Sequence, residues 1–234
     1  MRATLALLAA GAAALAAGVS PAGATTECRG LQVCVPVAGP WVVVPTGRTV
    51  PRPRVEYQLT CPRGYIVGGL DAELTSRAIE IAFLGRLGSP VNPGVTTTRS
   101  AVFVATYVGS SRGVQTARPH IGCMPASGGG QRVPTAVSVV PPGQPTTRRV
   151  KNTRLRPRRT QSVVQGCARG ERLVAASHAV GFYKRRPPSA ALVASVGAVQ
   201  TIRGGRAIVQ VRSGAALRGV RAVVQVSAVC AGGR

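Results

Sequence analysis

The chain has 234 residues, of which 45% are hydrophobic, and its 30 Lys and Arg against six Asp and Glu give a formal net charge of +24. Apolar segments recur along the whole chain, which excludes a disordered polypeptide. Six acids cannot neutralise 30 basic side chains, so most of these must face water or an external anion. Apart from Lys151 and Lys184 the basic residues are all arginine, and with abundant Ala, Gly, Val and Pro this is typical of a GC-rich bacterial coding sequence. Part of the arginine excess is therefore codon bias.

The first 24 residues have the anatomy of a secretory signal peptide. Arg2 precedes an apolar run at 4–17, and Ala22-Gly23-Ala24 forms an A-x-A cleavage site. The apolar run is short for a membrane span of about 20 residues, and no second run of that length follows. We therefore expect a signal peptide at 1–24, no transmembrane segment after its cleavage, and a secreted protein that is extracellular or associated with the cell wall.

Six cysteines in the mature region predict disulfide bonds, because an even number in an exported chain is typical of them. Two cysteines open a repeated phrase, C-P-R-G at 61–64 and C-A-R-G at 167–170, and each has a partner about sixty residues downstream. The recurrence selects three pairs: Cys28–Cys34, Cys61–Cys123 and Cys167–Cys230. Zinc is disfavoured, since no C-x-x-C occurs and His120 and His178 lie near no cysteine cluster. We expect no metal and no cofactor.

Apolar stretches, several with a period of two residues, predict β-strands throughout the mature chain. In the first half they fall at 41–45, 55–61, 65–74, 78–83, 101–108 and 114–123. In the second half they fall at 136–141, 161–167, 173–182, 191–199, 207–211 and 220–230. No stretch has the capped 3.6-residue stripe of a long helix.

The matching series predict a tandem duplication. We expect an all-β fold of two homologous antiparallel β-sandwich-like modules, each braced by a disulfide. Module 1 covers 25–124 with a short N-terminal disulfide segment, a linker follows at 125–134, and module 2 covers 135–234. On the last strand the face toward the core is expected to hold Ala222, Val224, Val226, Ala228 and Cys230. The sequence leaves open whether the modules pack together and what the oligomeric state is.

An arginine-rich segment at 148–159 is expected as a loop that is longer than its first-half counterpart. It has seven basic residues and no acid: Arg148, Arg149, Lys151, Arg154, Arg156, Arg158 and Arg159. The first half has a smaller version in Arg48, Arg52 and Arg54. Guanidinium groups bind phosphate and carboxylate through forked hydrogen bonds. We therefore predict a non-catalytic protein that binds polyanions through these residues, with an anionic cell-wall polymer, a polysaccharide or a lipid surface as partner.

The sequence leaves a second interpretation of this segment open. The segment could equally be a solvated loop whose charge only preserves solubility and prevents aggregation. Sequence-specific nucleic-acid binding is not expected, since aromatic platforms and a recognition module are missing.

A hydrolase would use Ser111 in the G-x-S-x-G match at 109–113, with His120 as its base and Asp71 to orient the histidine. That motif needs a strand-to-helix junction, whereas here it reads as a turn between strands. A partner-binding protein such as a protease inhibitor would present the proline-stiffened stretch 89–94.

Overall fold

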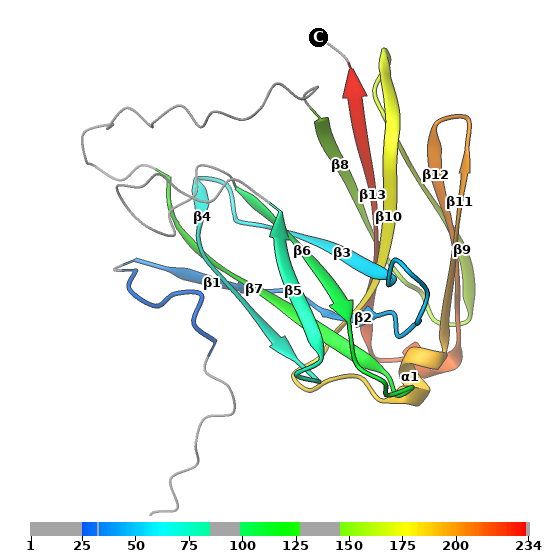
Figure 1. Cartoon of the computed structure of the whole chain (residues 1–234), viewed down its shortest axis with the longest axis horizontal. Coiled ribbons are helices and arrows are strands. Elements are labelled where there is room, and N and C mark those ends of the chain that lie inside the picture. The colour runs from blue at the N-terminus through cyan, green and yellow to red at the C-terminus, as the bar shows by residue number, and fades with distance from the viewer. Residues whose placement is uncertain (1–24, 32, 85–98, 127–145, 233–234) are drawn as a thin grey trace, which may run out of the picture.

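The computed structural model describes residues 25–31, 33–84, 99–126 and 146–232. As predicted, the fold is nearly all β, with antiparallel strands in three sheets (Figure 1). Regular helix in the described residues is limited to α1 (Ala190–Ala194) and a single 3₁₀ turn, η1 (Ala215–Leu217). None of the helices in these residues is long and apolar enough to cross a membrane.

The largest sheet runs through both halves of the chain. Strands β1 and β2 lie end to end along one edge of β7, and β4 pairs with the other edge. Pairing of β2 with β10, through Val42 with Gly181 and Trp41 with Phe182, then joins the first half to β10, β13 and β8. The halves therefore share one sheet. Its strands are β1 (Val35–Ala38), β2 (Trp41–Val44), β4 (Tyr65–Leu74), β7 (Gln115–Pro125), β8 (Thr146–Arg154), β10 (Glu171–Tyr183) and β13 (Arg221–Gly232).

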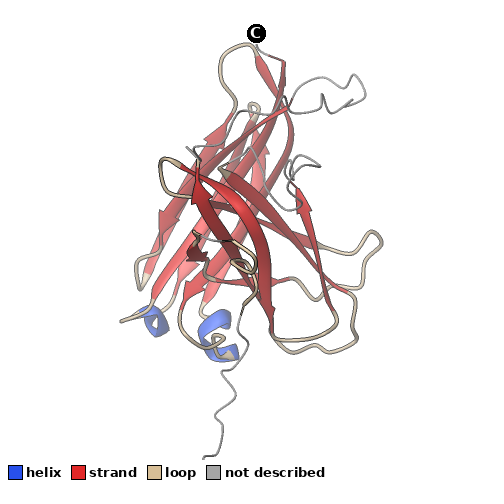
Figure 2. Cartoon of the chain, turned by 90° about the vertical axis from the view of Figure 1, so that its left-hand side faces the viewer, coloured by secondary structure: helices blue, strands red, loops and turns tan. Residues whose placement is uncertain are grey.

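Two three-stranded sheets cover opposite faces of this shared sheet (Figures 1 and 2). Alternation along β13 shows the arrangement: Val223 packs in one core with Tyr57, whereas Val224 packs in the other core with Val209. Both faces of β13 are thus buried between layers. The covering sheet of the first half contains β3 (Arg54–Thr60), β6 (Ser100–Tyr107) and β5 (Ile79–Leu84). That of the second half contains β9 (Arg159–Gly166), β12 (Arg206–Ser213) and β11 (Val196–Arg203).

The two halves have the same strand pairings. In the shared sheet β4 pairs with β7 in the first half as β10 pairs with β13 in the second. In the covering sheets β6 lies between β3 and β5 as β12 lies between β9 and β11. The repeated phrase forms the same kind of turn in both, with φ at +81° for Gly64 and +85° for Gly170, a region that glycine enters at no steric cost. This symmetry is compatible with two tandem modules.

All three predicted disulfides are present: Cys28–Cys34, Cys61–Cys123 and Cys167–Cys230. The last two close loops with sequence separations of 62 and 63 residues. Closing a loop of that length stabilises the fold by about 4 kcal/mol in the chain-entropy account. Three disulfides in a chain of this size fit an oxidising compartment.

The face of β13 predicted to point inward is fully buried, at Ala222, Val224, Val226, Ala228 and Cys230. The opposite face, expected to be outside the core, is buried as well, because the covering sheet of the first half packs on it. The predicted strand at 191–199 is correct only in its second part. Its start is α1, because Ser189 caps the helix by accepting a hydrogen bond from the Leu192 backbone N–H, and the Ala-Ala-Leu run favours a helix. The predicted strand 136–141, most of the linker and the stretch 89–94 lie outside the described residues.

The arginine-rich segment is not a loop. Residues 146–154 form β8, at an edge of the shared sheet, and β9 begins at Arg159, so only residues 155–158 connect the two strands. Strand β8 pairs with β13 as β1 and β2 pair with β7. It therefore occupies the place in the second half that β1 and β2 together have in the first. An edge strand leaves long charged side chains free to reach water, and charge at an edge also prevents pairing with other chains.

Candidate anion-binding site

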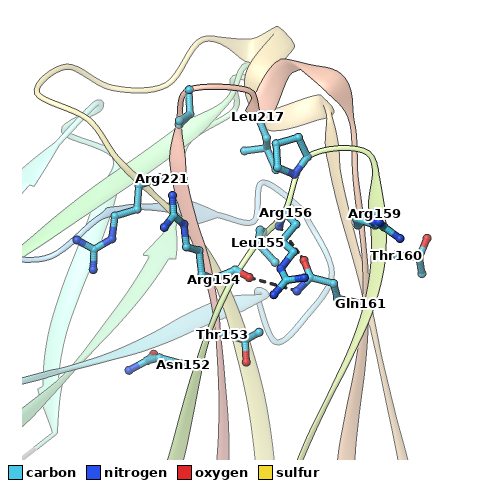
Figure 3. Close-up of a pocket in the computed structure, with 13 residues that line it drawn as sticks. Asn152, Thr153, Arg154, Leu155, Arg156, Arg159, Thr160, Gln161, Leu217 and Arg221 are labelled. Atoms are coloured by element: carbon cyan, nitrogen blue, oxygen red, sulfur yellow. Dashed lines mark hydrogen bonds between the residues drawn. The ribbon is translucent and has the colours of Figure 1, made fainter.

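A hollow of about 960 Å³ opens where β8 turns into β9, at one end of the second half (Figure 3). It is lined by residues of β8, β9 and the start of β13. Four arginines are among them, namely Arg154, Arg156, Arg159 and Arg221. The described residues that line it include no acid. The arrangement is a concave surface of one charge sign.

The turn that presents the arginines is held in place from both sides. Leu155 is 2% exposed and packs in the core with Leu217. The side-chain amide of Gln161 accepts a hydrogen bond from the Arg156 backbone N–H at 2.8 Å and donates one to the Arg154 carbonyl at 3.2 Å (Figure 3). A fixed backbone lowers the entropy lost on binding, because fewer groups must be ordered when the ligand arrives.

The surroundings of the hollow reinforce its positive potential. Residues 146–232 contain seventeen Lys and Arg but a single acid, Glu171. Glu171 pairs with Gly232 at one end of β10. At the other end of β10, Tyr183 pairs with Arg221, which lines the hollow. The basic run 184–186 follows Tyr183 at this same end. A field of one sign in a concave surface concentrates counter-ions there.

The structure brings together three of the predicted residues, Arg154, Arg156 and Arg159, and adds one that the sequence did not single out. Arg221 has its guanidinium 4.3 Å from the centre of the Tyr183 ring, a cation–π contact that fixes it. Figure 3 shows its side chain directed away from Arg156 and Arg159. Arg221 joins the hollow only through the pairing of β13 with β8, a relation between distant segments that local sequence patterns do not contain.

Two other predicted residues, although in the same run, are bound to carboxylates. Arg148 Nη1 lies 2.6 Å from Glu56 Oε2 and donates to the Ser227 hydroxyl at 2.9 Å. Arg149 makes a forked pair with Glu171 at 2.7 and 2.9 Å. That pair lowers the pKa of Glu171 and raises the pKa of Arg149, because each charge is stabilised by the other. The guanidinium groups of these two arginines are already paired with carboxylates of the chain itself, so the candidate site does not include them.

The remaining predicted residues lie apart from the hollow or at its margin. Arg48 donates a hydrogen bond to the Ser110 carbonyl, in the loop after β6, at 3.0 Å. Arg52 donates one to the carbonyl of Tyr107, the last residue of β6, at 3.2 Å. Arg54 pairs with Glu56 at 3.5 Å. Lys151 donates to a carbonyl of β9 at 3.5 Å. These first-half arginines therefore do not line the hollow. Arg158 lines a neighbouring hollow instead.

The proposed hydrolase motif is a loop between two strands, β6 of the covering sheet and β7 of the shared sheet. The Ser111 hydroxyl accepts a hydrogen bond from the Gly113 backbone N–H at 3.1 Å, and the Ser111 N–H donates to the Tyr107 hydroxyl at 2.9 Å. These bonds stabilise the turn locally. The strand-to-helix junction that gives the motif its catalytic geometry is not present at this position.

His120, the candidate base, is buried under the N-terminal segment. Its Nδ1 lies 3.6 Å from Glu27 Oε1 and its Nε2 lies 3.7 Å from Glu73 Oε1. Asp71 faces His120 across β4 and β7, but its carboxylate accepts a hydrogen bond from the Thr26 backbone N–H. Within the described contacts, none joins His120 to Ser111. This cluster instead fixes the N-terminal segment against the sheet, where a Cβ on Gly69 would overlap the Glu27 carbonyl.

One set of residues in the described part of the chain has the proximity of metal ligands: Cys167, Glu171 and Cys230. The two sulfurs are joined to each other in a disulfide and are not free to bind a cation. Comparison of the chain with protein-family models, with curated proteins and with solved structures gives no significant match.

Proposed function

We propose that this chain is a secreted, non-catalytic protein that binds anionic polymers through the arginine-lined hollow at the β8–β9 turn. The observation that carries the proposal is the grouping of Arg154, Arg156 and Arg159 on a pinned turn with no acid in the lining. Guanidinium groups bind phosphate and carboxylate oxygens in a forked geometry. The signal-peptide anatomy and the three disulfides support an extracellular or cell-wall location.

The expected binding is electrostatic and multivalent. Each exposed arginine alone binds an anion weakly in water, but several on one surface engage successive charges of one polymer. Such binding releases the counter-ions condensed on the polymer, so affinity falls steeply as salt rises. Candidate partners in an extracellular setting are wall polymers with phosphodiester backbones and acidic polysaccharides.

The experiment is a salt titration of binding to immobilised poly(glycerol phosphate). The hollow variant carries Arg154→Gln, Arg156→Gln and Arg159→Gln. A matched control carries Arg63→Gln, Arg77→Gln and Arg112→Gln, which removes the same charge from exposed positions of the first half. The hollow variant should lose affinity, and its slope of log K against log salt should fall by about three, one for each lost contact.

The control should keep nearly all of the wild-type slope. Equal losses in the two variants would show that only net charge matters and that the hollow has no special role. Absence of binding by the wild-type protein at low salt would remove the proposal altogether.

A further inference from the structure

The shared sheet is interrupted between β2 and β10. Strand β2 pairs with β10 only at Gly181 and Phe182, and residues 171–180 of β10 have β13 as their one strand partner among the described residues. Figure 1 shows β1 and β10 diverging from β2 on this side. One edge of β10 is therefore free within the sheet, and not only at its outer borders.

A hollow of about 450 Å³ follows this free edge, and we call it the slot. Five consecutive residues of β10, 176–180, line it. Its other lining residues include Val55 of β3, Val193 of α1 and Val196 of β11. Strands β3 and β11 belong to the two covering sheets, which lie on opposite faces of the shared sheet. The slot is thus a place where both outer layers are present and the middle layer has room for a further strand.

The edge of β10 in the slot lacks the features that protect strand edges from pairing. Charged side chains and proline are the usual protection, and the outer edges of the shared sheet have such charges. Strand β8 carries four basic residues, and β4 carries Asp71 and Glu73. Residues 175–181 of β10 read A-A-S-H-A-V-G, with no charged residue and no proline. Small side chains there let another backbone come close.

One backbone group on this edge already has a partner that imitates a strand. Gln200 Nε2 donates to the Ala176 carbonyl at 3.1 Å, and Gln200 Oε1 lies 3.0 Å from His178 Nδ1. The amide makes the hydrogen bond that the N–H of a neighbouring strand would make. An edge strand directs the N–H and C=O groups of every second residue outward, so further groups of the same kind face the slot.

We propose that the slot binds an extended peptide of a partner protein, which adds as a strand to the free edge of β10. In this mode of recognition, backbone hydrogen bonds give affinity and alternate side chains give specificity. Successive side chains of the added strand point to opposite faces, where they meet Val55 on one side and Val193 and Val196 on the other. A run of about five apolar residues, spanning about 17 Å, fits beside 176–180.

The charge of the protein selects the residues on either side of that apolar run. Arg54 lines the slot with a side chain that is 66% exposed, and the chain has a formal net charge of +24. Acidic flanks are therefore attracted to the slot. A second copy of this chain has the same positive charge, and its own β10 edge lies in the same kind of recess. A separate extended peptide suits the slot better than a folded copy does.

The test uses a fluorescent synthetic peptide, E-E-V-A-V-V-V-E-E, with binding measured by anisotropy. Two further peptides have the same side chains but are N-methylated at alternate central residues, in opposite phase. A strand directs alternate N–H groups to one side, so one methylated peptide should bind about ten-fold more weakly and the other should bind as the parent does. This comparison does not depend on how any protein variant folds. Amide hydrogen exchange should show protection at every second residue of 176–180 on binding.

A variant that fills the slot provides the second measurement. Val193→Arg places a long side chain in the slot, keeps a good helix former in α1 and adds no negative charge, so it should weaken binding about ten-fold. Val199→Arg, at a residue of β11 that is 66% exposed and outside the slot lining, is the matched control and should bind as the wild type does. The hollow variant should also keep its peptide affinity, because the slot is a separate site.

Three results would overturn strand addition. The first is equal binding by both methylated peptides, and the second is equal binding of E-E-G-S-G-S-G-E-E, which would leave charge as the sole cause. The third is a wild-type dimer in sedimentation that Val193→Arg dissociates, which would assign the slot to a second copy. None of these results bears on polymer binding, so the proposed function stands or falls by its own salt titration.

Discussion

The side-chain amide of Gln225 bonds both backbone groups of Gln58, although the two residues are 167 positions apart. The Gln58 N–H donates to Gln225 Oε1 at 2.6 Å, and Gln225 Nε2 donates to the Gln58 carbonyl at 3.0 Å. The same Nε2 also donates to Asn152 Oδ1 at 2.9 Å. Gln225 is 2% exposed, in the middle of β13. A glutamine in this position acts as a neighbouring strand would, and it joins the covering sheet of the first half to a strand of the second.

Replacing that glutamine should therefore loosen the contact between the halves. Gln225→Met keeps the length of the side chain but leaves the half-buried N–H and carbonyl of Gln58 without partners. We expect the free energy of unfolding to fall by about 3 kcal/mol. Urea denaturation measures it. Gln210→Met, at an exposed glutamine of β12, should change stability by less than about 0.5 kcal/mol. Equal stability of the two variants would show that the amide does not hold the halves together.

Arg148 and Arg156 belong to one arginine run but should behave in opposite ways. Arg148→Ala leaves the buried Glu56 carboxylate without its 2.6 Å partner, so unfolding should become easier by about 3 kcal/mol. Arg156→Ala removes an exposed side chain and should change stability by less than about 0.5 kcal/mol. In the salt titration against poly(glycerol phosphate) the order should reverse, with only Arg156→Ala lowering the slope. A lower slope for Arg148→Ala would place that residue in the binding surface.

Much of the scaffold follows from local patterns in the sequence. The six cysteines with their repeated phrase indicate the three disulfides, and period-two alternation indicates the strands and one of the two buried faces of β13. These features depend on residues close together or on a repeat that aligns the halves. Segment 190–194 is different, because its Ala and Leu fit a buried strand or a helix equally well until Ser189 is recognised as a cap.

The candidate site could be predicted only in part. Composition located the arginines at 148–159, but it could not separate those that bind a carboxylate from those that do not. That distinction depends on Glu56, which is 92 positions from Arg148 in the sequence. The contribution of Arg221 depends on the pairing of β13 with β8. That pairing has no signature in the residues next to Arg221.

The pair between Arg149 and Glu171 predicts a pH dependence of stability. Hydrogen bonds from Arg149 and from the Ala168 N–H lower the pKa of Glu171 in the folded state. The carboxylate therefore stabilises the fold at pH values above its unfolded pKa of about 4.3, and this contribution is lost as pH falls through the folded value. Glu171→Gln should lower Tm at neutral pH, and the difference from wild type should close in acid. Glu80→Gln, at an exposed acid of β5, is the matched control. A difference that stays constant with pH would contradict the assignment.

The buried hydroxyl of Ser213 should reduce the stability of the fold. This hydroxyl has no partner in the described residues, and such a group costs about 1–3 kcal/mol. Ser213→Ala should thus raise the free energy of unfolding by about 1 kcal/mol. Ser227→Ala offers a contrast, since Ser227 is 3% exposed but bonded to Arg148, and its loss should destabilise the protein.

Urea denaturation of the two variants and the wild type measures these effects. A Ser213→Ala variant that is less stable than wild type would mean that the hydroxyl is already bonded within the fold.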